Sequence, residues 1–90
     1  METIRINLNQ MKTQEEAIRV FAGVKGFPAY FSGNLDSLYE ILTDWTSPLK
    51  IEIEIGGDLT PFAAMMGMLE DARQANANLL FVVIMRKGNA

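Results

Sequence analysis

Residues 49–55 read Leu-Lys-Ile-Glu-Ile-Glu-Ile, a stretch in which apolar and charged residues alternate without a break. Because successive side chains of a β-strand point to opposite faces, this pattern predicts a strand with one buried face and one wet face. Residues 3–8 alternate in the same way around Ile4 and Ile6. Residues 79–85 are wholly apolar and rich in branched side chains, which is typical of a strand covered on both faces. The chain therefore contains three candidate strands.

The segment between the first two strands predicts two helices. Thr13 and Glu16 have the spacing of a capping box, in which their side chains satisfy free amides at the start of a helix. Asn34 is a good N-cap for the second helix, and the apolar residues after it recur at three- and four-residue spacing as far as Trp45. That spacing places them in one buried stripe, and Pro48 prevents the helix from continuing.

A third helix is predicted between the second and third strands, with Thr60 as its capping residue, Pro61 in its first turn and its end near Asn76. Helical crossovers normally join parallel strands and are nearly always right-handed. The order therefore predicts a two-layer α/β fold (β-α-α-β-α-β), a three-stranded parallel sheet with helices packed on one face. The apolar last strand does not suit the wet face, so either another element covers it or it forms an intermolecular contact.

The composition limits both the size and the chemistry of the protein. We expect a single domain over residues 1–86 and a flexible C-terminal tail over residues 87–90. The chain contains no cysteine and no histidine, so disulfides, the usual zinc sites, a thiol nucleophile and a histidine base are all excluded. We expect no metal, no cofactor and no enzymatic activity.

The charge of the chain predicts the class of partner. A net charge of −3 and a pI near 4.8 disfavour nucleic acid and anionic membranes and favour a cationic protein. The N-terminus lacks the basic and apolar pattern of a signal peptide, and the longest apolar run, residues 79–85, is too short to cross a bilayer. A cytoplasmic location is therefore predicted.

The second predicted helix carries an acidic face. Asp36, Glu40 and Asp44 are four residues apart, with Tyr39 and Thr43 beside them. Like charges at this spacing destabilise a helix by roughly 0.2–0.5 kcal/mol per pair, which suggests a role outside the scaffold. A solvated polar face accounts for the charges alone equally well. Tyr39, however, lies off the buried stripe and is a better interface candidate. Asp36 and Glu40 could serve as an acid–base pair, but no nucleophile or metal cluster accompanies them.

Residues 28–45, Pro-Ala-Tyr-Phe-Ser-Gly-Asn-Leu-Asp-Ser-Leu-Tyr-Glu-Ile-Leu-Thr-Asp-Trp, resemble the signature of the barstar family, small intracellular inhibitors of barnase-type secreted ribonucleases. The family pattern is a proline, an aromatic pair, a glycine-containing link, then Asn-Leu-Asp-x-Leu-aromatic-acid-x-Leu-Thr and a tryptophan. It matches here without a gap, and the order of strands and helices agrees with the family's fold.

The resemblance implies a one-to-one complex with a basic ribonuclease, in which the loop and the second helix plug the active site. Glu40 then stands where an acidic side chain replaces a substrate phosphate, and an acid from the last helix, here Asp71, also contributes. The residues implied as partner-binding are Tyr30, Asn34, Asp36, Tyr39, Glu40, Thr43, Asp44 and Asp71.

Three of these positions depart from the founding member of the family. It has aspartate where this chain has Glu40, tryptophan in place of Tyr39 and glycine in place of Asp44, and these residues would touch the partner. The resemblance therefore leaves the target nuclease open. The alternative hypothesis is a non-inhibitory interaction module on the same fold, one version of which self-associates through the apolar last strand.

Overall fold

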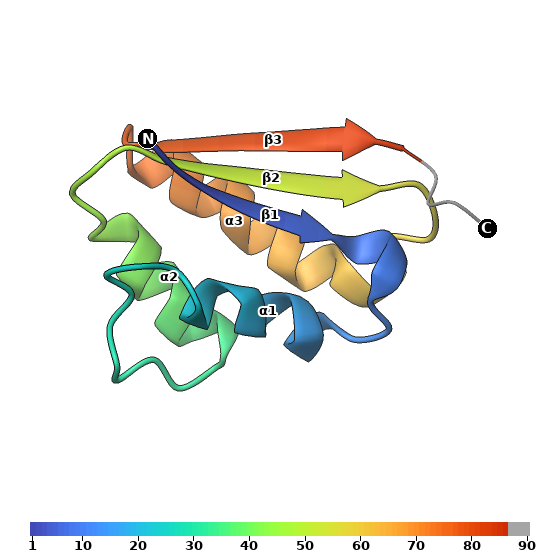
Figure 1. Cartoon of the computed structure of the whole chain (residues 1–90), viewed down its shortest axis with the longest axis horizontal. Helices are drawn as coiled ribbons and strands as arrows, with labels where there is room; N and C mark the ends of the chain where they lie inside the picture. The colour runs from blue at the N-terminus through green and yellow to red at the C-terminus, as the bar shows by residue number, and fades with distance from the viewer. Residues whose placement is uncertain (87–90) are drawn as a thin grey trace.

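The computed structural model describes residues 1–86. The elements follow in the order β1 (Glu2–Asn7), α1 (Gln14–Ala22), α2 (Leu35–Thr43), β2 (Leu49–Ile55), α3 (Ala63–Ala75) and β3 (Leu79–Met85) (Figure 1). Two short 3-10 turns, η1 (Leu8–Gln10) and η2 (Thr60–Phe62), come after β1 and before α3. The predicted flexible tail, residues 87–90, lies outside the described residues.

The three strands form one parallel sheet in the order β1-β2-β3, with β2 at the centre. Ile51 of β2 lies opposite Ile4 of β1 and Phe81 of β3. All three helices lie on the same side of the sheet (Figure 1), as right-handed crossovers between strands in sequence order require. The predicted two-layer β-α-α-β-α-β fold is confirmed.

The alternation in β2 separates the two faces of the sheet. Its apolar residues, Leu49, Ile51, Ile53 and Ile55, are at most 2% exposed and face the helices. On the other face Lys50 Nζ lies 3.5 Å from Glu52 Oε2, and Arg86 Nη1 lies 2.7 Å from Glu54 Oε1. Such exposed ion pairs contribute little stability, so the buried row of apolar side chains is what holds the sheet to the helices.

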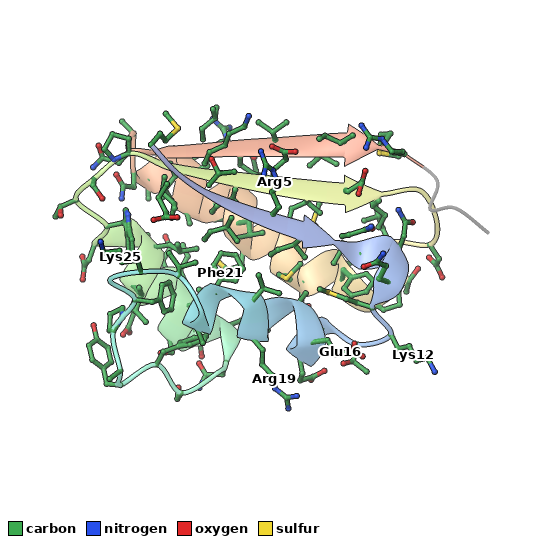
Figure 2. All side chains as sticks on the ribbon, in the orientation of Figure 1. Arg5, Lys12, Glu16, Arg19, Phe21 and Lys25 are labelled. Atoms are coloured by element: carbon green, nitrogen blue, oxygen red, sulfur yellow. The ribbon has the colours of Figure 1, made fainter. Side chains whose placement is uncertain are left out.

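Each helix contributes fully buried side chains to the layer beneath the sheet. Phe21 comes from α1, Leu38 and Leu42 from α2, and Met65 and Leu69 from α3. Figure 2 shows Phe21 pointing towards the sheet while Arg19 of the same helix points away from it. The core therefore lies between β2 and the inner faces of the three helices.

The start of the third helix differs from the prediction. Thr60 does not cap α3, because it lies inside the η2 turn, where the amides of Phe62 and Ala63 donate to the carbonyls of Leu59 and Thr60, so the α-helix begins only at Ala63. The amide and hydroxyl of Thr60 donate to Asp58 Oδ1, at 2.9 and 2.7 Å, and these two bonds lower the pKa of the Asp58 carboxyl. The free amide of Met65 instead donates to Gln14 Oε1 at the start of α1, 2.9 Å away.

Two other boundaries are corrected by smaller amounts. The second helix ends at Thr43 with Asp44 as its C-cap, so Trp45 lies just beyond the helix instead of in its last turn. The first strand ends at Asn7, and Leu8 begins the η1 turn while remaining buried. Neither shift changes which apolar side chains reach the core.

The prediction that the last strand is covered on both faces is wrong. Leu80, Val83 and Met85 are 47%, 40% and 74% exposed. The reason is that β3 is an edge strand, and within residues 1–86 only β2 pairs with it. The helices therefore cover the centre of the sheet better than this edge.

A single side chain joins the ends of α2 and α3. Asn76, the C-cap of α3, is the one buried polar residue among residues 1–86. Its Nδ2 donates to the carbonyls of Leu42 and Trp45, at 2.9 and 2.8 Å, and its Oδ1 accepts from the amide of Asn78, 3.0 Å away. The carboxamide thus holds the C-terminal end of α2 against the chain that enters β3.

We predict that Asn76→Ala lowers the free energy of unfolding by about 2–3 kcal/mol, because it removes the three hydrogen bonds that the carboxamide makes to the carbonyls of Leu42 and Trp45 and to the amide of Asn78. Urea denaturation followed by the fluorescence of Trp45, the only tryptophan, measures this change. The control is Gln10→Ala, which removes an exposed carboxamide that makes no side-chain hydrogen bond within the described residues. Equal stabilities of the two variants would contradict the role given to Asn76.

Candidate functional site

The helix that carries the acidic residues has well-defined ends. Asn34 caps α2 as predicted, because its Oδ1 accepts from the amide of Ser37 at 2.7 Å and its Nδ2 donates to Ser32 Oγ at 3.0 Å. Gly33, with φ of 82°, provides the left-handed turn just before the cap. At the other end the Thr43 hydroxyl donates to the carbonyl of Glu40, 3.0 Å away. These bonds fix the direction in which α2 presents its outer face.

The outer face of α2 is an unneutralised row of carboxylates. Asp36, Glu40 and Asp44 are all exposed, and Tyr39 is exposed beside them. Within residues 1–86, none of the three carboxylates takes part in an ion pair or a side-chain hydrogen bond. The opposite side of the helix is buried through Leu38, Ile41 and Leu42. We call this row of Asp36, Glu40 and Asp44 the acidic face.

A loop packed by aromatic rings lies beside the acidic face. The ring of Phe27 is 6.3 Å from that of Phe21, 5.2 Å from that of Phe31 and 5.7 Å from that of Trp45, measured between centroids. Such pairs add stability beyond the area that they bury. They hold the loop against the core while Tyr30 remains 76% exposed.

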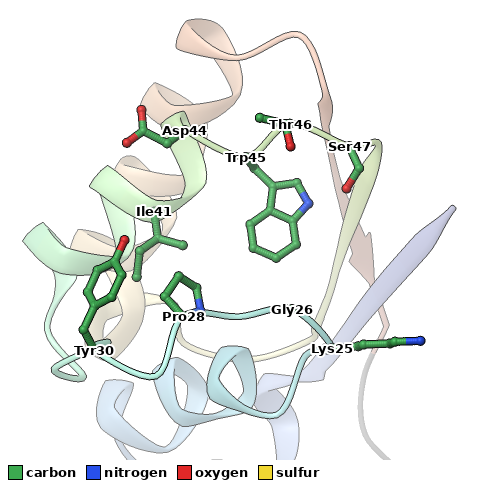
Figure 3. Close-up of a pocket in the computed structure, with 9 residues that line it drawn as sticks. All are labelled: Lys25, Gly26, Pro28, Tyr30, Ile41, Asp44, Trp45, Thr46 and Ser47. Carbon is green, nitrogen blue, oxygen red and sulfur yellow. The ribbon is translucent and has the colours of Figure 1, made fainter.

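The loop and the end of α2 line an open cavity of about 360 Å³ (Figure 3). Tyr30 from the loop and Asp44 from α2 both line it, with Ile41 and Trp45 supplying apolar surface. Trp45 Nε1 is buried without a hydrogen-bond partner among the described residues. The remaining lining residues are Lys25, Gly26, Pro28, Thr46 and Ser47. The cavity thus joins apolar and charged surface at one end of the acidic face.

The eight residues predicted to bind a partner do not all meet. Asp36, Tyr39, Glu40 and Thr43 lie along α2, capped by Asn34 and followed by Asp44, and the cavity brings Tyr30 to the same end. Asp71 is exposed on α3, which packs against α2. Over residues 1–86, no hydrogen bond or ion pair links its carboxylate to the other seven.

Two residues that shape this surface were not singled out from the sequence. Phe27 anchors the loop, and its position just before Pro28 in an aromatic-rich segment was an available signal. Asn76 holds the end of α2 through the carbonyls of Leu42 and Trp45. These two carbonyls lie more than thirty residues from Asn76 in the chain, and no sequence pattern predicts a hydrogen bond to so distant a backbone group.

The described residues offer little for other kinds of function. Across residues 1–86, histidines, cysteines and carboxylates nowhere gather in a group of three or more that could hold a metal ion. In the same part of the chain, every helix is too short or too polar to span a membrane.

Comparison with known proteins identifies the family. A search of curated proteins returned no match. The model of the Barstar family, described as barnase inhibitor, matches residues 1–86. Barstar proteins are inhibitors and not enzymes, in agreement with the prediction that this chain is not an enzyme. Because the match covers nearly the whole 90-residue chain, the protein belongs to the barstar family.

Proposed function

We propose that this protein inhibits a basic ribonuclease by inserting the acidic face of α2 into the cleft that holds RNA. Membership of the barstar family implies a barnase-like ribonuclease as the partner. The observation that carries the proposal is the row of three exposed carboxylates, none of which forms an ion pair within the described residues. A complementary set of cations on a partner would neutralise them.

The chemistry of a ribonuclease cleft fits this row. An enzyme that holds a polyanion lines its cleft with arginine, lysine and histidine, whose N–H groups form short, strong bonds with carboxylates. Glu40 lies near the middle of the acidic face, between Asp36 and Asp44, so we assign it the place of a substrate phosphate. Its side chain is one methylene longer than the aspartate of the founding family member, which favours a deeper or wider phosphate site.

The loop supplies the second half of the proposed interface. Tyr30 stands exposed on a loop held by the Phe27 rings, so a partner meets a large aromatic surface that is already ordered. Pre-ordered surfaces lose less entropy on binding. The cavity between Tyr30 and Asp44 has room for one partner side chain, and its lining contains both the carboxylate of Asp44 and the cationic Lys25.

Asp71 has a separate place in the proposal. It is exposed on α3, outside the row along α2, so we assign it to the rim of the interface. Charges at a rim affect the rate of encounter more than the lifetime of a complex. We also place the protein in the cytoplasm, where an inhibitor would protect the RNA of its own cell.

We predict that Glu40→Gln speeds dissociation from the target ribonuclease by roughly 10- to 100-fold, because a hydrogen bond to a charged group contributes about 1.5–3 kcal/mol. Surface plasmon resonance with the immobilised nuclease measures the rate. The matched control is Glu15→Gln, which removes the same charge from an exposed position on α1 and should leave dissociation unchanged.

Equal dissociation rates for Glu40→Gln, Asp36→Asn and the wild type would show that the acidic face is not the interface. Thermal unfolding of each variant is recorded alongside. Glu40 is exposed and forms no ion pair within residues 1–86, so its loss should leave the melting temperature within a few degrees.

A second prediction concerns ionic strength. Association with the nuclease should slow by roughly tenfold or more between low salt and about 0.5 M NaCl, because salt screens the long-range attraction that steers encounter. The dissociation rate should change much less. Stopped-flow fluorescence of Trp45 measures the association rate. An association rate that is independent of salt would contradict steering by the acidic face.

A further inference from the structure

The edge strand β3 has outward backbone groups along most of its length. The carbonyl of Asn78 accepts from the amide of Leu49, and the amide of Arg86 donates to the carbonyl of Ile55. The backbone groups of these even-numbered residues therefore point towards β2. Because the direction alternates along a strand, Phe81, Val83 and Met85 direct their N–H and C=O groups away from the sheet.

Nothing in β3 protects this edge. From Leu79 to Met85 the strand has no charge, no proline and no glycine, although natural edge strands usually carry at least one such feature. Leu80, Val83 and Met85 also expose apolar side chains. The other edge of the sheet differs, because β1 carries Glu2 and Arg5. β3 is therefore the side of the sheet suited to pair with another strand.

We propose that β3 pairs antiparallel with β3 of a second copy of this chain, about a two-fold axis at Val82. This register places Phe81 opposite Val83 of the other copy, and Leu79 opposite Met85. These are odd-numbered residues whose backbone groups face outward, so they form the hydrogen-bonded pairs. They give about six bonds in all, because the amide of Leu79 already donates to the carbonyl of Asn76 in each copy. Val82 meets its own symmetry mate at a non-hydrogen-bonded position, where side chains approach most closely.

The side chains favour a second copy over a foreign strand. Under the same symmetry Leu80 lies opposite Ile84 of the other copy, so apolar residues meet along the whole strand. Beyond the strand ends, Asn78 lies opposite Arg86, and no like charges meet. The strand has no charged or polar side chain that would distinguish one foreign partner from another. About a two-fold axis, however, each apolar side chain of β3 faces an apolar side chain of the second copy.

The position of β3 also suits a dimer. In Figure 1, β3 forms the upper edge of the molecule and α2 lies on the lower side. Two copies joined through β3 therefore keep their acidic faces apart and free for partners. One pair of seven-residue strands covers less than the roughly 800 Å² per partner of a standard interface. We therefore expect association in the micromolar range.

Sedimentation equilibrium of the full chain over a range of concentrations tests the proposal, with Val82→Lys as the disrupting variant. A lysine at this position lies beside Glu52 of β2, so the monomer accommodates it. In the dimer the two lysines would lie directly opposite each other, which weakens association by roughly tenfold or more. The control is Gln74→Lys, which adds the same charge at an exposed position on α3 and should leave the dimer unchanged.

A mixing experiment tests the register itself. Val82→Lys and Val82→Glu should each be monomeric alone and associate when mixed, because opposite charges then face each other across the axis. A wild-type protein that stays monomeric at about 1 mM would overturn the proposal. So would a dimer that Val82→Lys does not weaken, or variants that do not associate on mixing.

Discussion

The carboxamide of Asn76 is the contact on which the position of α2 and its acidic face depends. Its two donors hold the carbonyls of Leu42 and Trp45, and its oxygen holds the amide of Asn78 at the entry to β3. One side chain therefore sets the end of α2 relative to the sheet. Because Trp45 in turn packs against Phe27, the same contact also positions the loop that carries Tyr30.

The acidic face lowers the stability of α2, and the packing of the rest of the fold offsets this loss. Carboxylates one turn apart repel each other along α2, and Asp44 lies at the end of the helix where negative charge is unfavourable. Capping by Asn34 and burial of Leu38 and Leu42 keep the helix in place. Helical stability in proteins comes mostly from such packing, so the fold tolerates unpaired charges on the outer face of α2.

The sequence predicts the elements well and their connections less well. The alternation of residues 49–55 and the Asn34 cap depend on near neighbours, and both are as expected. The assignment of Thr60 as a cap failed because residues 60–62 form the η2 turn and the α-helix begins only at Ala63, and residue type alone does not distinguish a 3-10 turn from the first turn of an α-helix. The contacts of Asn76 were not predictable because they cross the fold. The exposure of β3 followed from its place at the edge, which an apolar pattern does not reveal.

The parallel order of the sheet has a consequence for how the chain folds. β2 and β3 are joined by a single helix, whereas Glu2 of β1 must find Leu49 of β2 across the segment that contains both α1 and α2. Closing a longer loop costs more entropy and slows folding. We therefore expect residues 49–85 to form the early nucleus, with β1 pairing later. β1 would then be the last strand to join the sheet, so the edge opposite β3 would be completed only in the final step of folding.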